Sequence, residues 1–388
     1  MSLNSYDSWS PLREVVVGSA ENYSSHEREL SFDLFFHDEM PYSRMYYPRH
    51  RAPGEDASGE DGTDTGARQS PIKQRYVEEL QEDVEGMVDT LTSLGVTVHR
   101  PAPLAEHIEV RTPTFRAAVI PALNVRDNSI VLGDEVIETA PQVRARYFET
   151  QLLKPVFADY FRRGARWTVM PRPLMTDASF DLSYVTAHTA PGELMEPITD
   201  PRPSPYDVGH EMMIDGAQCL RLGRDVFVNV STANHALGCD WLERHLEGRF
   251  RVHRLDSLSD SHIDSTVLAL RPGLLLVRTP QIAERLPKRL RSWDMIFPPE
   301  PEDNQFPVYD DDDLLLTSRY IDLNVLSVAP DTVLVNSACP ELIRTLEKHR
   351  FTVVPVRHRH RRLFGGGLHC FTLDTVREGS APEDYLEG

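Results

Sequence analysis

Short apolar runs alternate along the chain with longer segments in which apolar residues recur at helical spacing. The clearest helix is predicted over 71–94, with Ser70 as its N-cap, Pro71 at its first position and Gly95 at its end. Its apolar face consists of Tyr76, Leu80, Val84, Met87, Leu91 and Leu94. Apolar runs at 13–20 and 96–101 flank it, which predicts a strand, a helix and a return strand.

The same order of strand, helix and strand can be traced five times. The predicted cycles start at 13–20, 128–138, 225–232, 273–279 and 331–338. Alternation of this kind indicates an α/β fold, and similar units at loose intervals favour a closed repeat. A doubly wound sheet also alternates, but no GxGxxG motif follows the first strand. We therefore predict one domain over 1–388, built from strand–helix–strand repeats.

Composition adds three constraints. The chain has 388 residues, of which 40% are hydrophobic and 26% charged, and this composition is ordinary for a globular protein. No signal peptide and no membrane-spanning run is evident in the sequence, so we expect a cytoplasmic protein. A net charge of −19 argues against nucleic-acid binding. The segment 50–71 is rich in Gly, Asp and Ser, and we expect it to be a mobile loop within the first repeat.

Four separated cysteines without a CxxC pair predict free thiols, and one of them has an unusual setting. Cys370 follows three glycines in "LFGGGLHCFTLD", where the backbone can approach its neighbours closely. A buried structural thiol is the commoner role of a lone cysteine. A nucleophilic role would require a base and groups that hold an sp² substrate against the sulfur.

Candidates for those groups occur in three other stretches. In "DSHIDST", His262 and Asp264 would share one face of an extended segment, so that the carboxylate could orient the imidazole. Asp215 lies in "MIDGAQ", and Asp127 comes immediately before a predicted strand. Taken alone, an HxD pair is more often a surface pair, and carboxylates at strand edges usually cap turns.

Together these stretches resemble the amidinotransferases, the family that contains the arginine:glycine and arginine:inosamine-phosphate enzymes. The resemblance covers nearly the whole chain, with "SYDSWSPLREVVVG", "HIDST", "LRPGL" and above all "GGGLHCFTLD". It implies a five-bladed α/β propeller of pentein type, which agrees with the five cycles. It also implies that Cys370 is the nucleophile and His262 the general acid and base. "HIDST", "LRPG" and "LRSW" look nearer the inosamine-phosphate branch, which suggests a specialised biosynthetic pathway.

The resemblance further implies roles for the substrate-binding residues. Asp127 and Asp215 would hold a guanidinium, Asp264 would support the site, and Ser318 matches a position associated with the amino-acid end of the donor. An arginine suited to clamp the donor carboxylate is replaced here by Gln281, so that Arg278 or Arg285 would have to substitute for it, or the donor would be held differently.

The expected reaction passes an amidino group through Cys370 to an amine and needs neither a metal nor an organic cofactor. The partners are then small molecules, and family analogy suggests a homodimer. The acidic run 309–313 is expected to be solvated and not to bind a metal. The basic run 357–362 is expected either to face solvent or to lie near the mouth of the pocket, where it would attract an anionic acceptor.

Two other readings remain open at this point. A guanidino-group hydrolase, such as an arginine deiminase, would use the same cysteine, histidine and carboxylates with water as the acceptor. A pentein that only binds a ligand would keep the fold without the reaction.

Overall fold

The computed structural model describes residues 2–24, 29–35, 72–182, 202–259, 262–309 and 315–386. The predicted loop at 50–71, which includes Ser70 and Pro71, lies outside the described residues. So does most of the acidic run, from Asp310 to Asp313. No helix in the described ranges is long and apolar enough to cross a bilayer.

Five three-stranded sheets dominate the part of the chain that the structure describes. They are β17 (Thr372–Arg377), β1 (Leu12–Val17) and β2 (Thr97–His99); β5 (Ser129–Leu132), β6 (Glu135–Glu138) and β7 (Arg166–Val169); β8 (Cys219–Leu222), β9 (Asp225–Val230) and β10 (Arg251–Asp256); β11 (Val267–Arg271), β12 (Leu274–Val277) and β13 (Asp294–Ile296); β14 (Leu326–Ala329), β15 (Thr332–Asn336) and β16 (Thr352–Val356). In each sheet the middle strand is antiparallel to the first strand named and parallel to the last.

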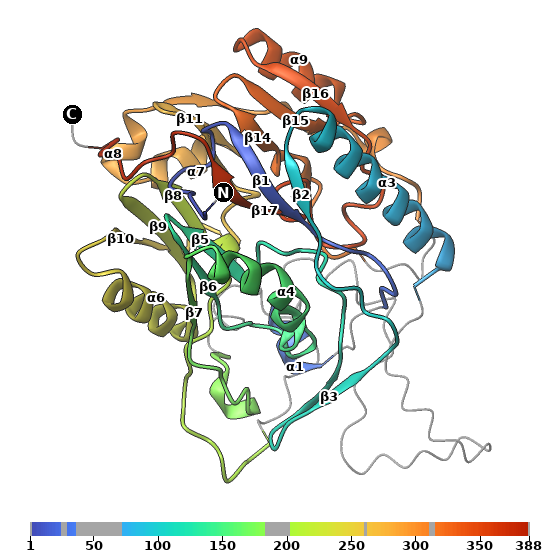
Figure 1. Ribbon diagram of the computed structural model, residues 1–388, viewed down its shortest axis with the longest axis vertical. Coiled ribbons are helices and arrows are strands. Elements are labelled where there is room, and N and C mark those ends of the chain that lie inside the picture. The colour runs from blue at the N-terminus through green and yellow to red at the C-terminus, as the bar shows by residue number, and fades with distance from the viewer. Residues whose placement is uncertain are drawn as a thin grey trace.

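Helices connect the middle strand of each sheet to its parallel neighbour. These crossovers are α3 (Gln74–Ser93), α4 (Glu149–Arg162), α6 (Ala233–Leu246), the pair α7 (Pro280–Arg285) and α8 (Lys288–Arg291), and α9 (Pro340–Lys348). Helices α3, α6, α8 and α9 lie around the outside of the sheets (Figure 1). The remaining elements are α1 (Leu30–Phe35), the hairpin β3 (Glu109–Arg111) and β4 (Arg116–Ala118), and the 3-10 turns η1 (Arg144–Arg146), η2 (Asp177–Ser179), η3 (Gly216–Gln218), η4 (Asp303–Gln305) and η5 (Ile321–Leu323).

The predicted strand–helix–strand cycles are present, but each sheet has one strand more than predicted. The run 128–138 is a hairpin, β5 and β6, and not one strand. Its two-residue turn contains Gly133 at a φ of 62°, and Gly223 and Gly273 occupy positive φ in the corresponding turns of the third and fourth sheets. In the first sheet the additional strand comes from the other end of the chain, because β17 pairs with β1.

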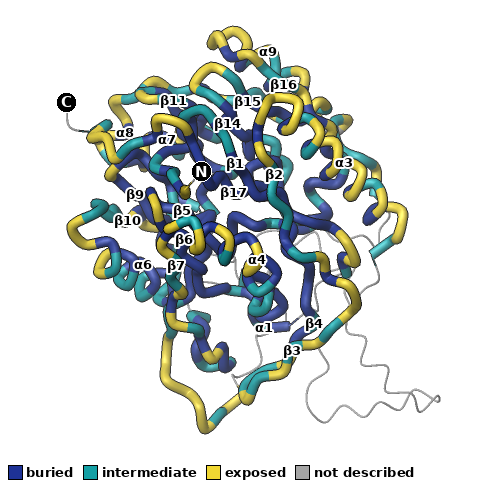
Figure 2. The backbone as a smooth tube through the Cα atoms, viewed as in Figure 1, coloured by how far each residue is buried: buried dark blue, intermediate teal, exposed yellow. Residues whose placement is uncertain are grey.

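Five apolar clusters fill the spaces between consecutive sheets. One cluster joins the first and second sheets, and others join the second to the third, the third to the fourth and the fourth to the fifth. A fifth cluster combines Val15 and Val17 of β1 with Leu326 of β14 and Leu334 of β15, so that the last sheet also packs on the first. Buried residues accordingly occupy the middle of the molecule and exposed residues its periphery (Figure 2).

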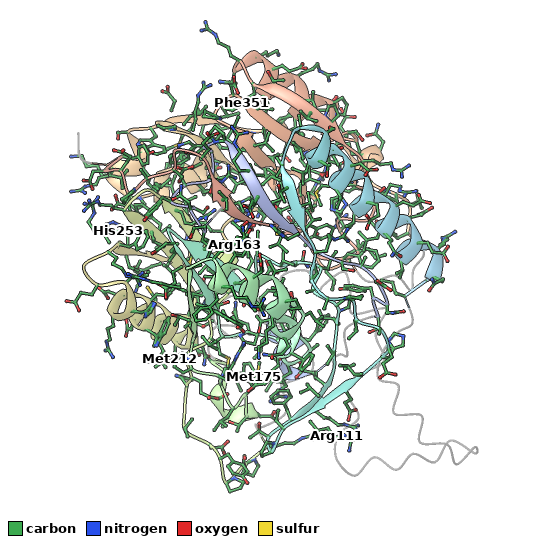
Figure 3. All side chains as sticks on the ribbon, viewed as in Figure 1. Arg111, Arg163, Met175, Met212, His253 and Phe351 are labelled. Atoms are coloured by element: carbon green, nitrogen blue, oxygen red, sulfur yellow. The ribbon has the colours of Figure 1, made fainter. Side chains whose placement is uncertain are left out.

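Buried ion pairs supplement this apolar packing. Asp374 of β17 accepts hydrogen bonds from Arg126, Arg221 and Arg377 at 2.6–2.8 Å. Burial opposes the charged carboxylate, but these three arginines hold the pKa of Asp374 well below its usual value. Side chains fill the space between helices and sheets (Figure 3), where Arg163 after α4 packs on a tyrosine ring 4.1 Å away.

Candidate active site

Five polar residues occupy equivalent places in the five sheets. Asp127, Asp215, Asp264, Asn324 and Cys370 lie in the loops that precede β5, β8, β11, β14 and β17, two to four residues before each strand. Because these five strands are the corresponding members of their sheets, the loops gather at one end of the molecule. The fold thereby brings together residues that are up to 243 positions apart in the sequence, as when Arg126 donates to the carbonyl of His369 at 2.9 Å.

The glycines before Cys370 allow two loops to touch the backbone. A Cβ on Gly366 would lie 2.1 Å from Asn124 Oδ1, and a Cβ on Gly367 would lie 2.5 Å from Asn324 Cβ. Gly365 has a φ of 71°, which favours glycine. The predicted close approach of the glycine-rich loop is confirmed, and it explains why three consecutive glycines are needed.

The thiol of Cys370 is enclosed among polar groups. The residue is 3% exposed, its Sγ donates to Asp264 Oδ2 at 3.4 Å, and its backbone N–H donates to Asn324 Oδ1 at 2.8 Å. Burial, with the negative charges of Asp264 and Asp127, raises the pKa of Cys370 well above its usual value. The unliganded site therefore holds a thiol, and a cation placed beside it would favour the thiolate.

His262 lies between two carboxylates. Its Nε2 is 2.8 Å from Asp215 Oδ2 and its Nδ1 is 3.8 Å from Asp127 Oδ1, while the ring of Phe35 in α1 packs edge-on at 5.3 Å. Burial disfavours the imidazolium, but the charge of Asp127 and the hydrogen bond with Asp215 raise the pKa of His262 to about 9. At neutral pH this histidine is a proton donor.

His369 has the opposite character. Its Nδ1 lies 2.8 Å from Asp264 Oδ2, and because a carboxylate only accepts, this nitrogen carries the proton. Burial and the nearby Arg126 lower the pKa of His369 to about 4, so the ring is neutral. Its hydrogen bond in turn lowers the pKa of Asp264 to about 2, although burial acts in the other direction. Asp264 is thereby kept ionised beside the sulfur.

Asp127 is fixed by a buried arginine. Arg146 Nη1 donates to Asp127 Oδ2 at 2.6 Å, and the same guanidinium bonds both oxygens of Glu149 at 2.6 and 2.9 Å. Burial raises the pKa of Asp127 and raises that of Glu149 to about 7, despite the adjacent arginine. The arrangement orients one oxygen of Asp127 toward Arg146 and leaves the other toward the site.

Three buried carboxylate oxygens of this site have no hydrogen-bond partner among the described residues: Asp127 Oδ1, Asp215 Oδ1 and Asp264 Oδ1. Such atoms are costly to bury without a donor. A planar cation with several N–H groups, such as a guanidinium, matches this set of acceptors. Within the described ranges, this site included, no group of three or more His, Cys, Asp or Glu residues could hold a metal ion.

Comparison with known proteins shows the family to which the chain belongs. The chain is 33% identical over 384 residues to inosamine-phosphate amidinotransferase 1 of Streptomyces glaucescens, with 98% of each chain covered. It is 28% identical to the mitochondrial glycine amidinotransferase of Xenopus tropicalis, covering 97% of this chain and 83% of that protein. The chain belongs to the amidinotransferase family. No family model matches it.

Solved structures of amidinotransferases have the same fold. The inosamine-phosphate amidinotransferase of Streptomyces griseus matches with a TM-score of 0.79 and 30% identity over 99% of both chains. SxtG, an amidinotransferase from the saxitoxin biosynthetic pathway of Microseira wollei, matches with a TM-score of 0.76 and 29% identity over 99% of both chains. A dimethylarginine dimethylaminohydrolase, at 10% identity and a TM-score of 0.53, shares the fold. This amidinotransferase is thus an α/β enzyme of pentein type and a transferase.

Within the amidinotransferase site, one predicted pairing is wrong. Asp264 was expected to orient His262, but it contacts His369 and Cys370, and Asp215 contacts His262 instead. The reason is local: residues 263–266 form a turn and not an extended segment, so the two side chains of the HxD pair do not share a face.

Ser318 and Gln281 are the two predicted substrate-binding residues outside this core. Ser318 is half-buried, and its Oγ accepts a hydrogen bond from the backbone N–H of Tyr320 at 3.2 Å. Gln281 is exposed in the first turn of α7. Within the described ranges, neither forms a hydrogen bond with Asp127, Asp215 or Asp264.

The basic run has a structural role that neither expectation anticipated. Arg357 and Arg359 pair with Asp83 of α3, His360 pairs with Glu79, and Arg361 pairs with Asp322 at 2.8 Å. His358, His360 and Arg361 are buried. The run therefore fixes α3 against the glycine-rich loop, and its charges are largely neutralised.

Proposed function

We propose that this amidinotransferase moves the amidino group of L-arginine, or of a related guanidino donor, to an amine through an amidino-Cys370 intermediate. The observation that carries the proposal is the set of three unpaired carboxylate oxygens around a buried thiol. The names of the relatives, which act in inosamine-phosphate, glycine and saxitoxin chemistry, favour a small amine as acceptor and a specialised biosynthetic pathway.

In the first half-reaction, the donor guanidinium binds beside Cys370 and donates hydrogen bonds to the unpaired oxygens of Asp127, Asp215 and Asp264. Its charge offsets the negative surroundings of Cys370 and favours the thiolate, so that the thiol proton is released to solvent as the donor binds. The sulfur bonds to the central guanidinium carbon, the bond from that carbon to the side-chain nitrogen of the donor breaks, and His262 supplies the proton to the departing amine. Arginine would leave as ornithine.

In the second half-reaction, His262 is neutral and removes a proton from the incoming amine. The amine nitrogen bonds to the amidino carbon, the carbon–sulfur bond breaks, and the Cys370 thiolate is restored, which regains its proton from solvent when the product leaves. One histidine serves both halves because its proton is returned at the end of the cycle.

We also propose that the five sheets are the blades of a closed propeller. Four apolar clusters, each shared by consecutive sheets, support closure, as does the fifth cluster, which joins the fifth sheet to the first. Pairing of β17 with β1 would fasten the two ends of the chain within one blade.

The decisive experiment is to load the enzyme with donor alone. After incubation with excess arginine and removal of small molecules, intact mass should reveal a species heavier by one amidino group, and peptide mapping should place it on Cys370. Cys370→Ser should fold normally and carry no adduct, because a serine hydroxyl supplies far less anion at neutral pH than a thiol.

The same experiment includes matched control variants and also tests for hydrolysis of the donor. Cys219→Ala, Cys239→Ala and Cys339→Ala should each still load. Release of citrulline without an acceptor would instead show a hydrolase, and absence of any adduct under rapid quench, with intersecting double-reciprocal lines, would show direct transfer in a ternary complex.

A further inference from the structure

The carboxylate of an amino-acid donor needs a cation that the catalytic core does not supply. The core groups beside the thiol are carboxylates, and the cations there already have partners: His262 pairs with Asp215, Arg126 with Asp374, and Arg146 with Asp127 and Glu149. An anion brought into such surroundings would be repelled unless a separate positive group received it. This question rests on the proposed function, because it concerns the far end of the donor.

Arg278 lies at the correct end of the fourth sheet. Val267 of β11 pairs with Val277 of β12, and the backbone N–H of Arg278 donates to the carbonyl of Thr266 at 2.9 Å. Thr266 comes two residues after Asp264, so Arg278 emerges from the sheet beside the loop that carries a catalytic carboxylate. This placement follows from the strand register and does not depend on the side-chain rotamer.

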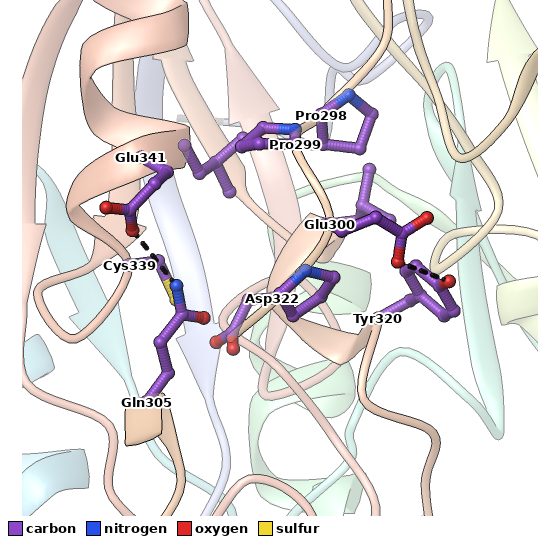
Figure 4. Close-up of a pocket in the computed structure, with 11 residues that line it drawn as sticks. Pro298, Pro299, Glu300, Gln305, Tyr320, Asp322, Cys339 and Glu341 are labelled. Carbon is purple, nitrogen blue, oxygen red and sulfur yellow. Dashed lines mark hydrogen bonds between the residues drawn. The ribbon is translucent and has the colours of Figure 1, made fainter. Parts of the chain in front are cut away.

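The guanidinium of Arg278 is supported by an aromatic ring. Its Cζ lies 4.3 Å from the ring centre of Tyr320, whose hydroxyl donates to Glu300 at 2.8 Å. Figure 4 shows this hydrogen bond at one side of a pocket that Tyr320 lines together with Pro298 and Pro299. Stacking leaves the N–H edge of a guanidinium available.

Ser318 is organised by the same tyrosine. The backbone N–H of Tyr320 donates to Ser318 Oγ at 3.2 Å, which leaves the hydroxyl proton of Ser318 for another acceptor. The segment then continues through η5 to Asn324, whose amide bonds both the Cys370 N–H and the carbonyl of Asp264. One short segment thus connects the thiol to the support of Arg278.

The other nearby arginines have partners that occupy them. Arg361 pairs with Asp322, Arg362 donates to the carbonyl of Thr317 at 3.2 Å, and Arg285 donates to the carbonyl of Ser257. Within the residues that the structure describes, Arg278 forms no side-chain hydrogen bond or ion pair. Its guanidinium stacks on the ring of Tyr320.

We propose that Arg278, presented on the ring of Tyr320, binds the carboxylate of the donor and determines the preference for an amino-acid donor, with the Ser318 hydroxyl as a second hydrogen-bond donor. The site would take a carboxylate-bearing guanidino compound in preference to a neutral one. It replaces the contact that Gln281, a neutral and exposed side chain, does not provide.

The test compares arginine with argininamide, in which a neutral amide of similar size replaces the carboxylate. In Arg278→Gln we expect kcat/KM for arginine to fall roughly 10- to 100-fold, the usual loss for a hydrogen bond to a charged group, and that for argininamide to change less than about twofold. Arg278→Lys, which keeps the charge but not the planar fork, should recover part of the preference. Arg285→Gln is the matched control and should leave both donors unchanged.

The possible failures are distinguishable. The proposed role of Arg278 is overturned if Arg278→Gln retains the wild-type preference for arginine. It is also overturned if kcat/KM falls equally for both donors in a variant whose melting temperature is unchanged. In either case amidino transfer itself would stand. If the wild-type enzyme loads Cys370 with neither donor, the proposed function and this inference fail together. Tyr320→Leu should reproduce the loss of preference, and Tyr320→Phe, which keeps the ring, should not.

Discussion

His262 is partly buried and His369 is buried in the same site, and each lies 2.8 Å from a carboxylate, yet their protonation is opposite. Their side chains are 15% and 8% exposed, so burial acts on both in the same direction. The pKa of His262 is raised to about 9 and that of His369 is lowered to about 4. The difference comes from the other charges nearby: His262 faces Asp127 as well as Asp215, whereas Arg126 opposes the effect of Asp264 on His369.

This contrast separates two tasks that a single histidine could not perform. In the reaction proposed above, a proton is delivered to the departing amine, which requires an imidazolium, and Asp264 stays ionised beside the sulfur, which requires a fixed hydrogen-bond donor. His262 suits the first task. His369 suits the second, and we expect it to act as a positioning residue through Asp264.

The sharpest way to break the comparison is to replace each histidine by asparagine. His262→Asn should slow ornithine release in a single turnover by about 10²–10⁴-fold, because the proton donor is lost. His369→Asn should slow ornithine release only about tenfold, since an amide can still donate a hydrogen bond near the position of Nδ1. His253→Asn, at the edge of the molecule in Figure 3, is the control and should have no effect on release.

Equal losses at positions 262 and 369 would contradict the division of roles. A melting curve for each variant distinguishes that result from general destabilisation. Release by His369→Asn that is as slow as that of His262→Asn in folded protein would move His369 from positioning to proton transfer.

The fold illustrates which signals a sequence carries. The helix-connected strands were predictable, because β12, β15 and their helices have unbroken apolar runs and clear ends. The first strand of each sheet was not, since the apolar pattern of 128–138 reads as one strand where the structure has a hairpin, and β17 pairs with a partner at the other end of the chain. The turn glycines, such as Gly223 before Asp225, were an available hairpin signal that apolar periodicity does not use.

The site divides in the same way. Cys370 was predictable because three glycines and the family motif mark it, and the structure places Asp127, Asp215 and His262 together as expected. Asn324 was missed, although its place before β14 repeats that of the other site residues. Arg146 and His369 were missed because their importance lies in buried contacts with Asp127 and Asp264, which only the tertiary structure supplies.

Asp264 provides a test that should move two measurements in opposite directions. Asp264→Asn removes a negative charge 3.4 Å from Cys370 Sγ, so the pKa of the thiol should fall and alkylation by iodoacetamide should be faster than in the wild type. Loading by arginine should nevertheless be slower, by about 10- to 100-fold, because the guanidinium loses a charged acceptor. Slower alkylation would show that Asp264 activates the thiol instead of suppressing its ionisation.

The protonation of His262 gives a smaller and continuous effect. Its raised pKa means that the proton is present below about pH 9 and is lost as pH rises through that value, so the rate of donor loading should decline there once other steps are constant. In Asp215→Asn the pKa of His262 should fall, and the decline should move to lower pH. An NMR titration of the imidazole checks this directly, and a midpoint unaffected by Asp215→Asn would remove that carboxylate as the cause.

The smallest expected effect comes from Gln281→Arg. This variant tests whether a charge added at the periphery of the site influences the donor, as the charges around the two histidines influence their protonation. Gln281 is exposed in the first turn of α7, so a new guanidinium there would be screened by solvent and worth about 0.2–1 kcal/mol, or a change of at most about fivefold. Donor affinity should change more than acceptor affinity if position 281 still lines the donor site. The informative comparison is with Arg278→Gln: if both positions serve one carboxylate, Gln281→Arg should improve arginine binding more in the Arg278→Gln background than in the wild type. Additive effects in this double-mutant cycle, measured as apparent arginine affinity, would mean that the two positions do not share a ligand group.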